Sequence, residues 1–120
     1  MSACPFCARI KAGDYDSAPG NPGVVWFEPL KPVTPGHVLV VPVRHVTDAL
    51  EDPDLTGRVF AAAARLADEL DDPSCNLITS VGGAATQSVY HLHAHLVPRR
   101  EGDGLPLPWT PQQDARKDSR

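Results

Sequence analysis

Apolar residues recur with helical spacing in one long segment of the chain. From Asp54 to Leu70 they step by four, three, four and four positions, which is the spacing of one α-helical face. The members of this face are Leu55, Val59, Ala62, Leu66 and Leu70. Asp52-Pro53 is a typical helix start, and Asp71-Asp72-Pro73 is a typical end, because the residue before a proline resists helical geometry. The pattern predicts the main helix of the fold here.

Short apolar runs bounded by turn residues predict the strands. Val24 to Phe27 is one such run, and Val38 to Val41 is a second, closed by Pro42. Asn76 to Val81 predicts a third strand, and the apolar alternation from about Val89 to Val97 predicts a fourth. The order strand, strand, helix, strand, strand indicates an α+β fold with an antiparallel sheet.

The segments between these runs are rich in residues that favour turns. Cys4 to Lys11 predicts a short helix ending at Gly13, and Asp14 to Gly23 predicts a turn-rich stretch. Glu28 to Gly36 has prolines at intervals of three and predicts an extended connection, whereas Gly82 to Thr86 predicts a loop of small residues.

Length and composition indicate one small globular domain. The chain has 120 residues, of which 42% are hydrophobic and 22% charged, so it can bury a modest core. Its 13 prolines argue against a helical bundle. We assign residues 1–100 to the domain and residues 101–120 to a loose, proline-rich tail, in which Trp109 could dock on the domain.

The charge balance restricts the partners. With 11 basic and 15 acidic residues the net charge is -4, so the chain lacks the basic excess of a nucleic-acid binder. A local site for a small anion is compatible with this net charge. No apolar run approaches the roughly 18 residues of a membrane span, and Met1 to Pro5 lacks the pattern of a signal peptide. We expect a cytoplasmic protein without a membrane or nucleic-acid partner.

Three cysteines cannot all pair with one another. In a reducing compartment the close pair Cys4 and Cys7 indicates a metal or redox feature, and Cys75 is predicted to be a small buried hydrophobe.

Three histidines alternate with apolar residues near the end of the domain. A strand would place His91, His93 and His95 on one face and the residues between them against the core. The pattern predicts a site built on a rigid element. Two other interpretations are a solvated, fortuitously His-rich strand edge and a metal site using two of the three imidazoles.

The segment His91-Leu92-His93-Ala94-His95-Leu96-Val97 resembles the H-x-H-x-H signature of the histidine triad (HIT) family. The similarity extends to Gln87-Ser88-Val89-Tyr90 before it, to Pro98-Arg99 after it, and to Pro35-Gly36-His37 far upstream. Cys4-Pro5-Phe6-Cys7 resembles the C-x-x-C of zinc-containing bacterial members. The resemblance covers about residues 4 to 100. It implies an antiparallel sheet of about five strands with one main helix and a short N-terminal helix, in a homodimer.

By this resemblance the protein is a nucleotide hydrolase or nucleotidyl transferase. The middle histidine, His93, would attack the α-phosphorus of a nucleoside phosphoramidate or related conjugate and form a covalent nucleotidyl-histidine. A neutral imidazole with a pKa near 6.5 is an available nucleophile at pH 7. His95 would donate a hydrogen bond to phosphate or a proton to the leaving group, and His37 would orient the set.

Alternatives to this activity are cleavage or phosphorolysis of dinucleoside polyphosphates and nucleotide binding as a scaffold with little turnover. A further alternative is a metalloenzyme whose metal is bound by the triad histidines themselves.

Four more residues are candidates for nucleotide binding by resemblance. Gln87 and Ser88 would contact phosphate oxygens or the departing group, Phe27 would line the base pocket, and Ser80 stands where the family often has an asparagine near the phosphate. Alternatively, the polar residues only stabilise a turn or the start of a strand, and Phe27 only packs in the core. Pro29 stands where the family often has an aspartate that holds the ribose hydroxyls, so nucleoside recognition should differ here.

A zinc site is predicted from two thiols and two imidazoles. Cys4 and Cys7 have C-x-x-C spacing, and by resemblance His45 and His91 complete a tetrahedral, closed structural site. The metal would fix the N-terminal segment beside His93 without acting as the catalyst. A reduced, metal-free cysteine pair is the alternative, and we expect no organic cofactor.

Overall fold

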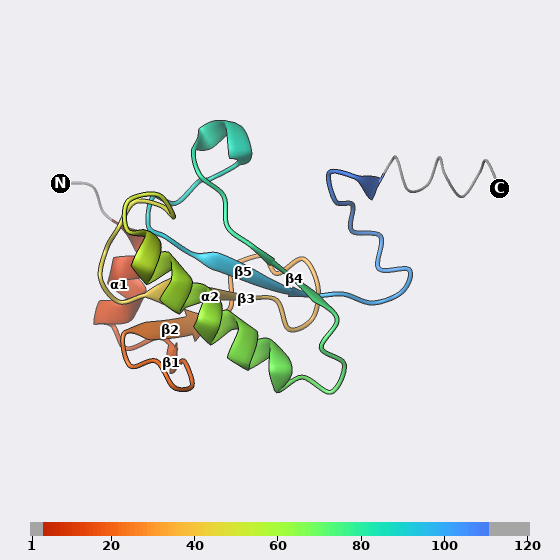
Figure 1. Ribbon diagram of the computed structural model, residues 1–120, viewed down its shortest axis with the longest axis horizontal. Coiled ribbons are helices and arrows are strands. Elements are labelled where there is room, and N and C mark those ends of the chain that lie inside the picture. Colours follow the sequence, from red (N-terminus) through yellow and green to blue (C-terminus); the bar gives the residue numbers. More distant parts are fainter. Residues whose placement is uncertain (1–3, 111–120) are drawn as a thin grey trace.

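The structure is a computed structural model that describes residues 4–110. A five-stranded antiparallel sheet with the order β1-β2-β3-β5-β4 is covered on one face by the longer helix, α2 (Figure 1). The elements in chain order are α1 (Pro5–Lys11), β1 (Asp16–Ser17), β2 (Val24–Phe27), β3 (Val38–Pro42), α2 (Pro53–Asp68), β4 (Cys75–Ile78), the 3₁₀ turn η1 (Gly83–Ala85) and β5 (Ala94–Pro98). The predicted α+β class and antiparallel sheet of five strands are confirmed.

Both predicted helices form, and each begins with a proline in its first turn. Cys4 caps α1, where its Sγ accepts from the Cys7 N–H at 3.3 Å. Asp52 caps α2, where its Oδ1 accepts from the Leu55 N–H at 3.1 Å. The α2 helix ends at Asp68, two positions before the predicted end at Leu70.

The core between α2 and the sheet is built by residues of both elements. Val40 of β3, Ala94 of β5 and Val59 of α2 are each 0% exposed. This α2-side core contains Ala18, Val24, Val40, Val46, Leu55, Val59, Ala62, Ala63, Leu92 and Ala94. Burial of a single large aliphatic side chain contributes about 1.5–3 kcal/mol, so this core is a main source of stability.

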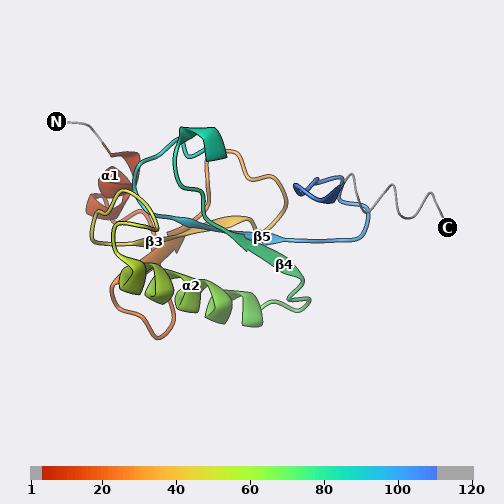
Figure 2. The ribbon, with the colours of Figure 1, turned by 45° about the horizontal axis from the view of Figure 1, so that its top comes forward.

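A second, smaller core lies on the other face of the sheet. It contains Phe6 of α1 together with Val25, Phe27, Leu39 and Val41 of β2 and β3. Figure 2 shows α2 beneath the sheet, and α1, η1 and the connection between β2 and β3 on the opposite side. Because side chains alternate along a strand, β2 and β3 supply both cores, and the second face is free to hold a site.

The pattern did not predict β1, and β4 and β5 have different bounds from those predicted. Asp16–Ser17 forms β1 against β2 inside the stretch predicted to be only turns. The β5 strand begins at Ala94 instead of Val89, because the Leu92 N–H bonds to Val46 O at 2.8 Å outside the sheet ladder. The β4 strand spans Cys75–Ile78, and beyond it the hydroxyl of Thr79 donates to His93 O at 2.7 Å in place of a ladder bond.

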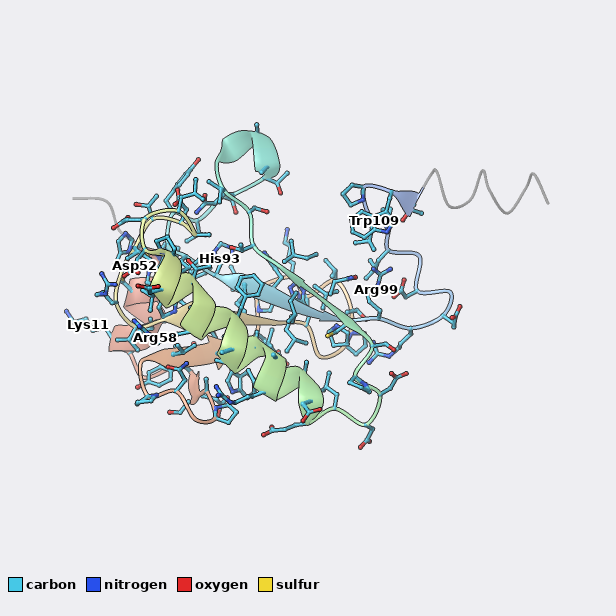
Figure 3. All side chains as sticks on the ribbon, in the orientation of Figure 1. Lys11, Asp52, Arg58, His93, Arg99 and Trp109 are labelled. Carbon is cyan, nitrogen blue, oxygen red and sulfur yellow. The ribbon has the colours of Figure 1, made fainter. Side chains whose placement is uncertain are left out.

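The beginning of the predicted tail is tied to the sheet. The Arg99 guanidinium donates to Asn76 Oδ1 at 2.7 Å, to Leu105 O at 2.6 Å and to the carboxylate of Asp103. This pairing holds the pKa of Asp103 far below its usual range. Trp109 is 52% exposed and lies beyond this turn (Figure 3). Positions 111–120 of the predicted tail lie outside the described residues.

Cys75 is half-buried in β4, so the prediction of a buried small residue is only partly met. Burial raises the pKa of its thiol. Neither helix of residues 4–110 has both the length and the apolar character that a bilayer crossing requires.

Candidate active site and metal centre

His93 and His95 project from the face of the sheet opposite α2. Ala94, between them, packs in the α2-side core, so its two neighbours point the other way. Leu39 is the ladder partner of His95 and belongs to the smaller core beneath α1. Because paired residues lie on the same face of a sheet, His95 also lies on the face opposite α2. His93 precedes the first residue of β5, and its side chain lies at that end of the strand (Figure 3).

Hydrogen bonds fix the proton positions of His37 and His95. The Val33 N–H donates to Nδ1 of His37 at 3.1 Å, so a neutral His37 carries its proton on Nε2. This Nε2 lies 2.9 Å from Nδ1 of His95 and therefore donates to it. His95 must then carry its own proton on Nε2. The pair presents an N–H donor at the outer nitrogen of His95.

The proton of His93 is fixed in the opposite sense. Its Nδ1 lies 2.8 Å from the carbonyl oxygen of His91, which can only accept a hydrogen bond. Nδ1 of His93 therefore carries the proton, and its Nε2 keeps a free lone pair. The rings of His93 and His95 lie 5.1 Å apart. The free lone pair of His93 and the N–H donor of His95 thus belong to neighbouring rings, a combination that suits attack on a phosphorus that bears a charged oxygen.

All three imidazoles of this group are held in the neutral form at pH 7. Burial lowers the pKa of His37, and it lowers the pKa of His93 against a smaller opposing effect of the hydrogen bond to His91. The pKa of His95 falls to about 4, first through burial and then through the neighbouring His93 and His37. A neutral imidazole is the form that has a lone pair for attack.

Gly36 allows His37 to reach this group. It has a φ of 87°, in the left-handed region that favours glycine. A Cβ added there would lie 3.2 Å from Cγ of Pro98. The P-G-H sequence therefore meets a steric need where the connection from β2 enters β3.

The four predicted metal ligands, Cys4, Cys7, His45 and His91, are brought together, with their ligand atoms all within 4.8 Å of one another. Nδ1 of His91 lies 3.4 Å from Sγ of Cys4, 3.5 Å from Sγ of Cys7 and 3.1 Å from Nδ1 of His45. Tetrahedral zinc with bonds of about 2.0–2.3 Å separates its ligand atoms by about 3.3–3.8 Å. The donor set suits a structural zinc ion, and three of the four short separations between ligand atoms, at 3.4–3.5 Å, lie in this range.

The ring orientation of His91 supports this fit. Its Nε2 lies 2.8 Å from Pro42 O, so Nε2 carries the proton and Nδ1 turns a lone pair toward the thiols. Burial and the neighbouring Cys4 raise the pKa of the Cys7 thiol. A bound cation would offset this effect by favouring the thiolate.

Phe6 connects the metal ligands with the triad, a contact that sequence reasoning missed. Its ring centroid lies 5.9 Å from that of His91, 5.0 Å from that of His93 and 5.4 Å from that of Phe27, each in an edge-on arrangement. Because Phe6 stands inside the C-x-x-C motif, the helix that carries the thiols also packs the ring of His93. The sequence signal for this contact was the position of an aromatic residue, Phe6, between the two predicted ligands Cys4 and Cys7.

Gln87 is buried, and its side-chain amide hydrogen-bonds to backbone groups. Its Oε1 accepts from the Gly82 N–H at 2.8 Å, and its Nε2 donates to Thr47 O at 2.8 Å and Val89 O at 3.2 Å. Both amide protons are therefore engaged. These bonds hold the loop around η1, and the predicted phosphate contact of Gln87 stays a prediction.

The other predicted nucleotide contacts lie in different surroundings. Ser88 is exposed, and Ser80 is half-buried beyond the end of β4. Phe27 is 3% exposed and belongs to the smaller core, as the core alternative stated. The Arg9 guanidinium lies 4.1 Å from its ring centroid and donates to Glu28 O at 2.8 Å. Nucleotide binding by these side chains stays a prediction.

Comparisons with known proteins agree with this fold and site. A family model described as the HIT domain matches residues 20–102. The chain therefore belongs to the histidine triad family, as the resemblance implied. It is 36% identical over 122 residues to Protein hit of Bacillus subtilis, covering 95% of this chain and 83% of that protein. It is 34% identical over 124 residues to adenosine 5'-monophosphoramidase HNT1 of Saccharomyces cerevisiae, covering 93% and 73%.

Solved structures show the same fold. A HIT family hydrolase from Clostridium thermocellum gives a TM-score of 0.71 at 27% identity, over 90% of this chain and 98% of that one. SMU.412c from Streptococcus mutans gives 0.72 at 30% identity, over 99% and 84%.

Proposed function

We propose that the protein hydrolyses nucleoside phosphoramidates or related nucleotide conjugates through a covalent intermediate on His93. The observation that carries the proposal is the fixed, neutral His93, whose Nδ1–H is bound to His91 O and whose Nε2 is free beside the donor of His95. Membership of the histidine triad family and a relative named as a monophosphoramidase support the same reaction class.

The reaction divides into two displacements at phosphorus. Nε2 of His93 attacks the α-phosphorus, the Nε2–P bond forms, and the bond from phosphorus to the leaving nitrogen breaks. The departing amine takes a proton from solvent. Water then attacks the phosphorus, releases one proton to solvent, and returns the electron pair of the Nε2–P bond to His93.

The neighbouring groups stabilise the charges that form. When His93 carries the nucleotidyl group its ring is cationic, and His91 O accepts the hydrogen bond from its Nδ1–H. Nε2–H of His95 donates to the phosphoryl oxygen on which negative charge builds. Of its two predicted roles, the hydrogen bond is supported over proton donation, because His95 has a pKa of about 4 and is neutral at pH 7, and the N–H of a neutral imidazole is a very weak acid.

The zinc site has a structural role in this proposal. Cys4, Cys7, His45 and His91 would hold the ion, which would neutralise the thiolates and fix α1 against the sheet. Its contribution to the site is indirect, through the position of Phe6 and of the His91 carbonyl.

We also propose a homodimer. The sheet ends at β4 on one edge and β1 on the other, and Ile78 of β4 is 39% exposed. Pairing of two chains would cover such an edge. Light scattering at micromolar concentration should give the mass of two chains, and the mass of one chain would refute the dimer.

The activity is tested with a panel of adenosine and guanosine phosphoramidates and dinucleoside polyphosphates, with His93→Ala as the control. Turnover of phosphoramidates that is lost in His93→Ala supports the proposal. Faster cleavage of the dinucleoside polyphosphates would favour the alternative hydrolase. Nucleotide binding without turnover of any compound would favour the scaffold and refute the proposal.

A further inference from the structure

The hydrogen bonds around His37 lead outward to Arg100. The Val33 N–H donates to Nδ1 of His37, and the His37 N–H donates to Thr34 O at 3.1 Å. The Arg100 guanidinium holds the same turn from outside: it donates to Oγ1 of Thr34 at 2.8 Å and to Pro35 O at 3.3 Å. We propose that Arg100 is a positioning residue that sets the proton positions of His37 and His95 by clamping the turn from Val33 to His37.

The location of Arg100 suits this role. It follows β5 by two residues, and β5 carries His95, so one continuous strand ties the turn to the imidazole that receives the His37 proton. Its planar guanidinium can donate to a hydroxyl and a carbonyl at once, which a lysine cannot do with the same geometry. The preceding Arg99 bonds to Asn76, Asp103 and Leu105 instead, so the two arginines serve different segments.

The turn depends on this contact. Thr34 is 8% exposed, and among the described residues Arg100 is the side chain that bonds its hydroxyl. Val33, which supplies the N–H to His37, is 55% exposed, and so has little packing to fix it. When the Thr34 contact is removed, the Val33 N–H loses its fixed direction toward Nδ1 of His37. His37 can then also carry its proton on Nδ1, and in that form the proton of His95 moves from Nε2 to Nδ1, so both forms are populated.

This inference rests on the proposed function for its effect on rate, but not for its structural readout. Nitrogen-15 NMR of the imidazoles reports which ring nitrogen carries the proton, without any substrate. In the unmodified chain His95 should show a protonated Nε2 and an unprotonated Nδ1. Arg100→Ala and Thr34→Val should each show a mixture of both forms at His95.

Variants of the same positions provide matched controls. Thr34→Ser keeps the hydroxyl and should keep the single proton position, and Arg100→Lys should give an intermediate result. Arg58→Ala removes a positive charge from α2, on the other face of the sheet, and should change nothing (Figure 3). Unchanged proton positions in folded Arg100→Ala and Thr34→Val would overturn the inference.

Kinetics separate positioning from substrate binding. With a phosphoramidate substrate, Arg100→Ala should lower kcat roughly 10-fold at nearly constant KM, because a mixture of proton positions at His95 weakens a hydrogen bond that matters in the transition state. A raised KM with unchanged kcat would mean that Arg100 binds the substrate directly, and would refute the inference. If no substrate turns over, the proposed function fails while the NMR result still decides the role of Arg100.

Discussion

Removal of the His37 side chain should raise the pKa of His95. In the intact site this pKa is about 4, against an ordinary value of 6.5. The difference corresponds to at most about 3.4 kcal/mol at about 1.36 kcal/mol per pKa unit. Burial is the first cause, and His93 and His37 add to it. His37→Ala removes one of these neighbours and opens the site to water, so the pKa of His95 should move toward 6.5.

The same difference has a consequence for stability. Between pH 6.5 and 4 the unfolded chain binds a proton at His95 more readily than the folded protein does. The free energy of unfolding therefore falls as the pH is lowered through this range. In His37→Ala this acid-dependent loss from His95 should be smaller.

The assay is an NMR titration of the imidazole carbons and nitrogens from pH 3.5 to 8, with each spectrum checked for the folded state. The midpoint for His95 should lie near 4 in the unmodified chain and closer to 6.5 in His37→Ala. Arg58→Ala should leave the midpoint unchanged. A midpoint near 6.5 in the unmodified chain, or no change in His37→Ala, would contradict the reasoning.

Three further predictions concern the metal, the packing of His93 and the nucleoside. Protein purified without chelator should contain about one zinc per chain; Cys7→Ser should lose it while Cys75→Ser retains it, and zinc-free unmodified protein would refute the site. Phe6→Ala should lower the free energy of unfolding by about 3–5 kcal/mol in chemical denaturation, because it empties a buried ring site; a loss below about 1 kcal/mol would contradict the packing role. Because Pro29 offers no acceptor to ribose hydroxyls, ribonucleotide and 2′-deoxyribonucleotide substrates should react at similar rates, and a tenfold preference for ribose would show another ribose contact.

The elements that the sequence pattern predicted well are those whose side chains repeat with a regular period. The α2 face, with Leu55 and Val59, and the β3 run that contains Val40 are buried as their periodicity indicated. The boundaries of β4 and β5 were not predictable in the same way. They depend on the bonds of Thr79 to His93 and of Leu92 to Val46, which join distant segments.

The candidate site shows a similar division. The alternation of His93 and His95 around Ala94 predicted their common face from local spacing alone. The metal set was predictable only through the family resemblance, because Cys7, His45 and His91 come from segments far apart in the chain. The proton positions and the contact of Phe6 with His93 follow from three-dimensional hydrogen bonding and packing, which no local pattern encodes.

The central claim is that Nε2 of His93 forms a covalent bond to phosphorus. It is tested most directly by acid-free denaturation of the protein during turnover of an adenosine phosphoramidate, followed by mass spectrometry of the intact chain and its peptides. The account predicts one added nucleotidyl group on His93, lost on acid treatment and absent from His93→Ala. His95→Ala should still form the adduct, more slowly. An adduct on another residue, or full turnover by His93→Ala, would contradict the claim.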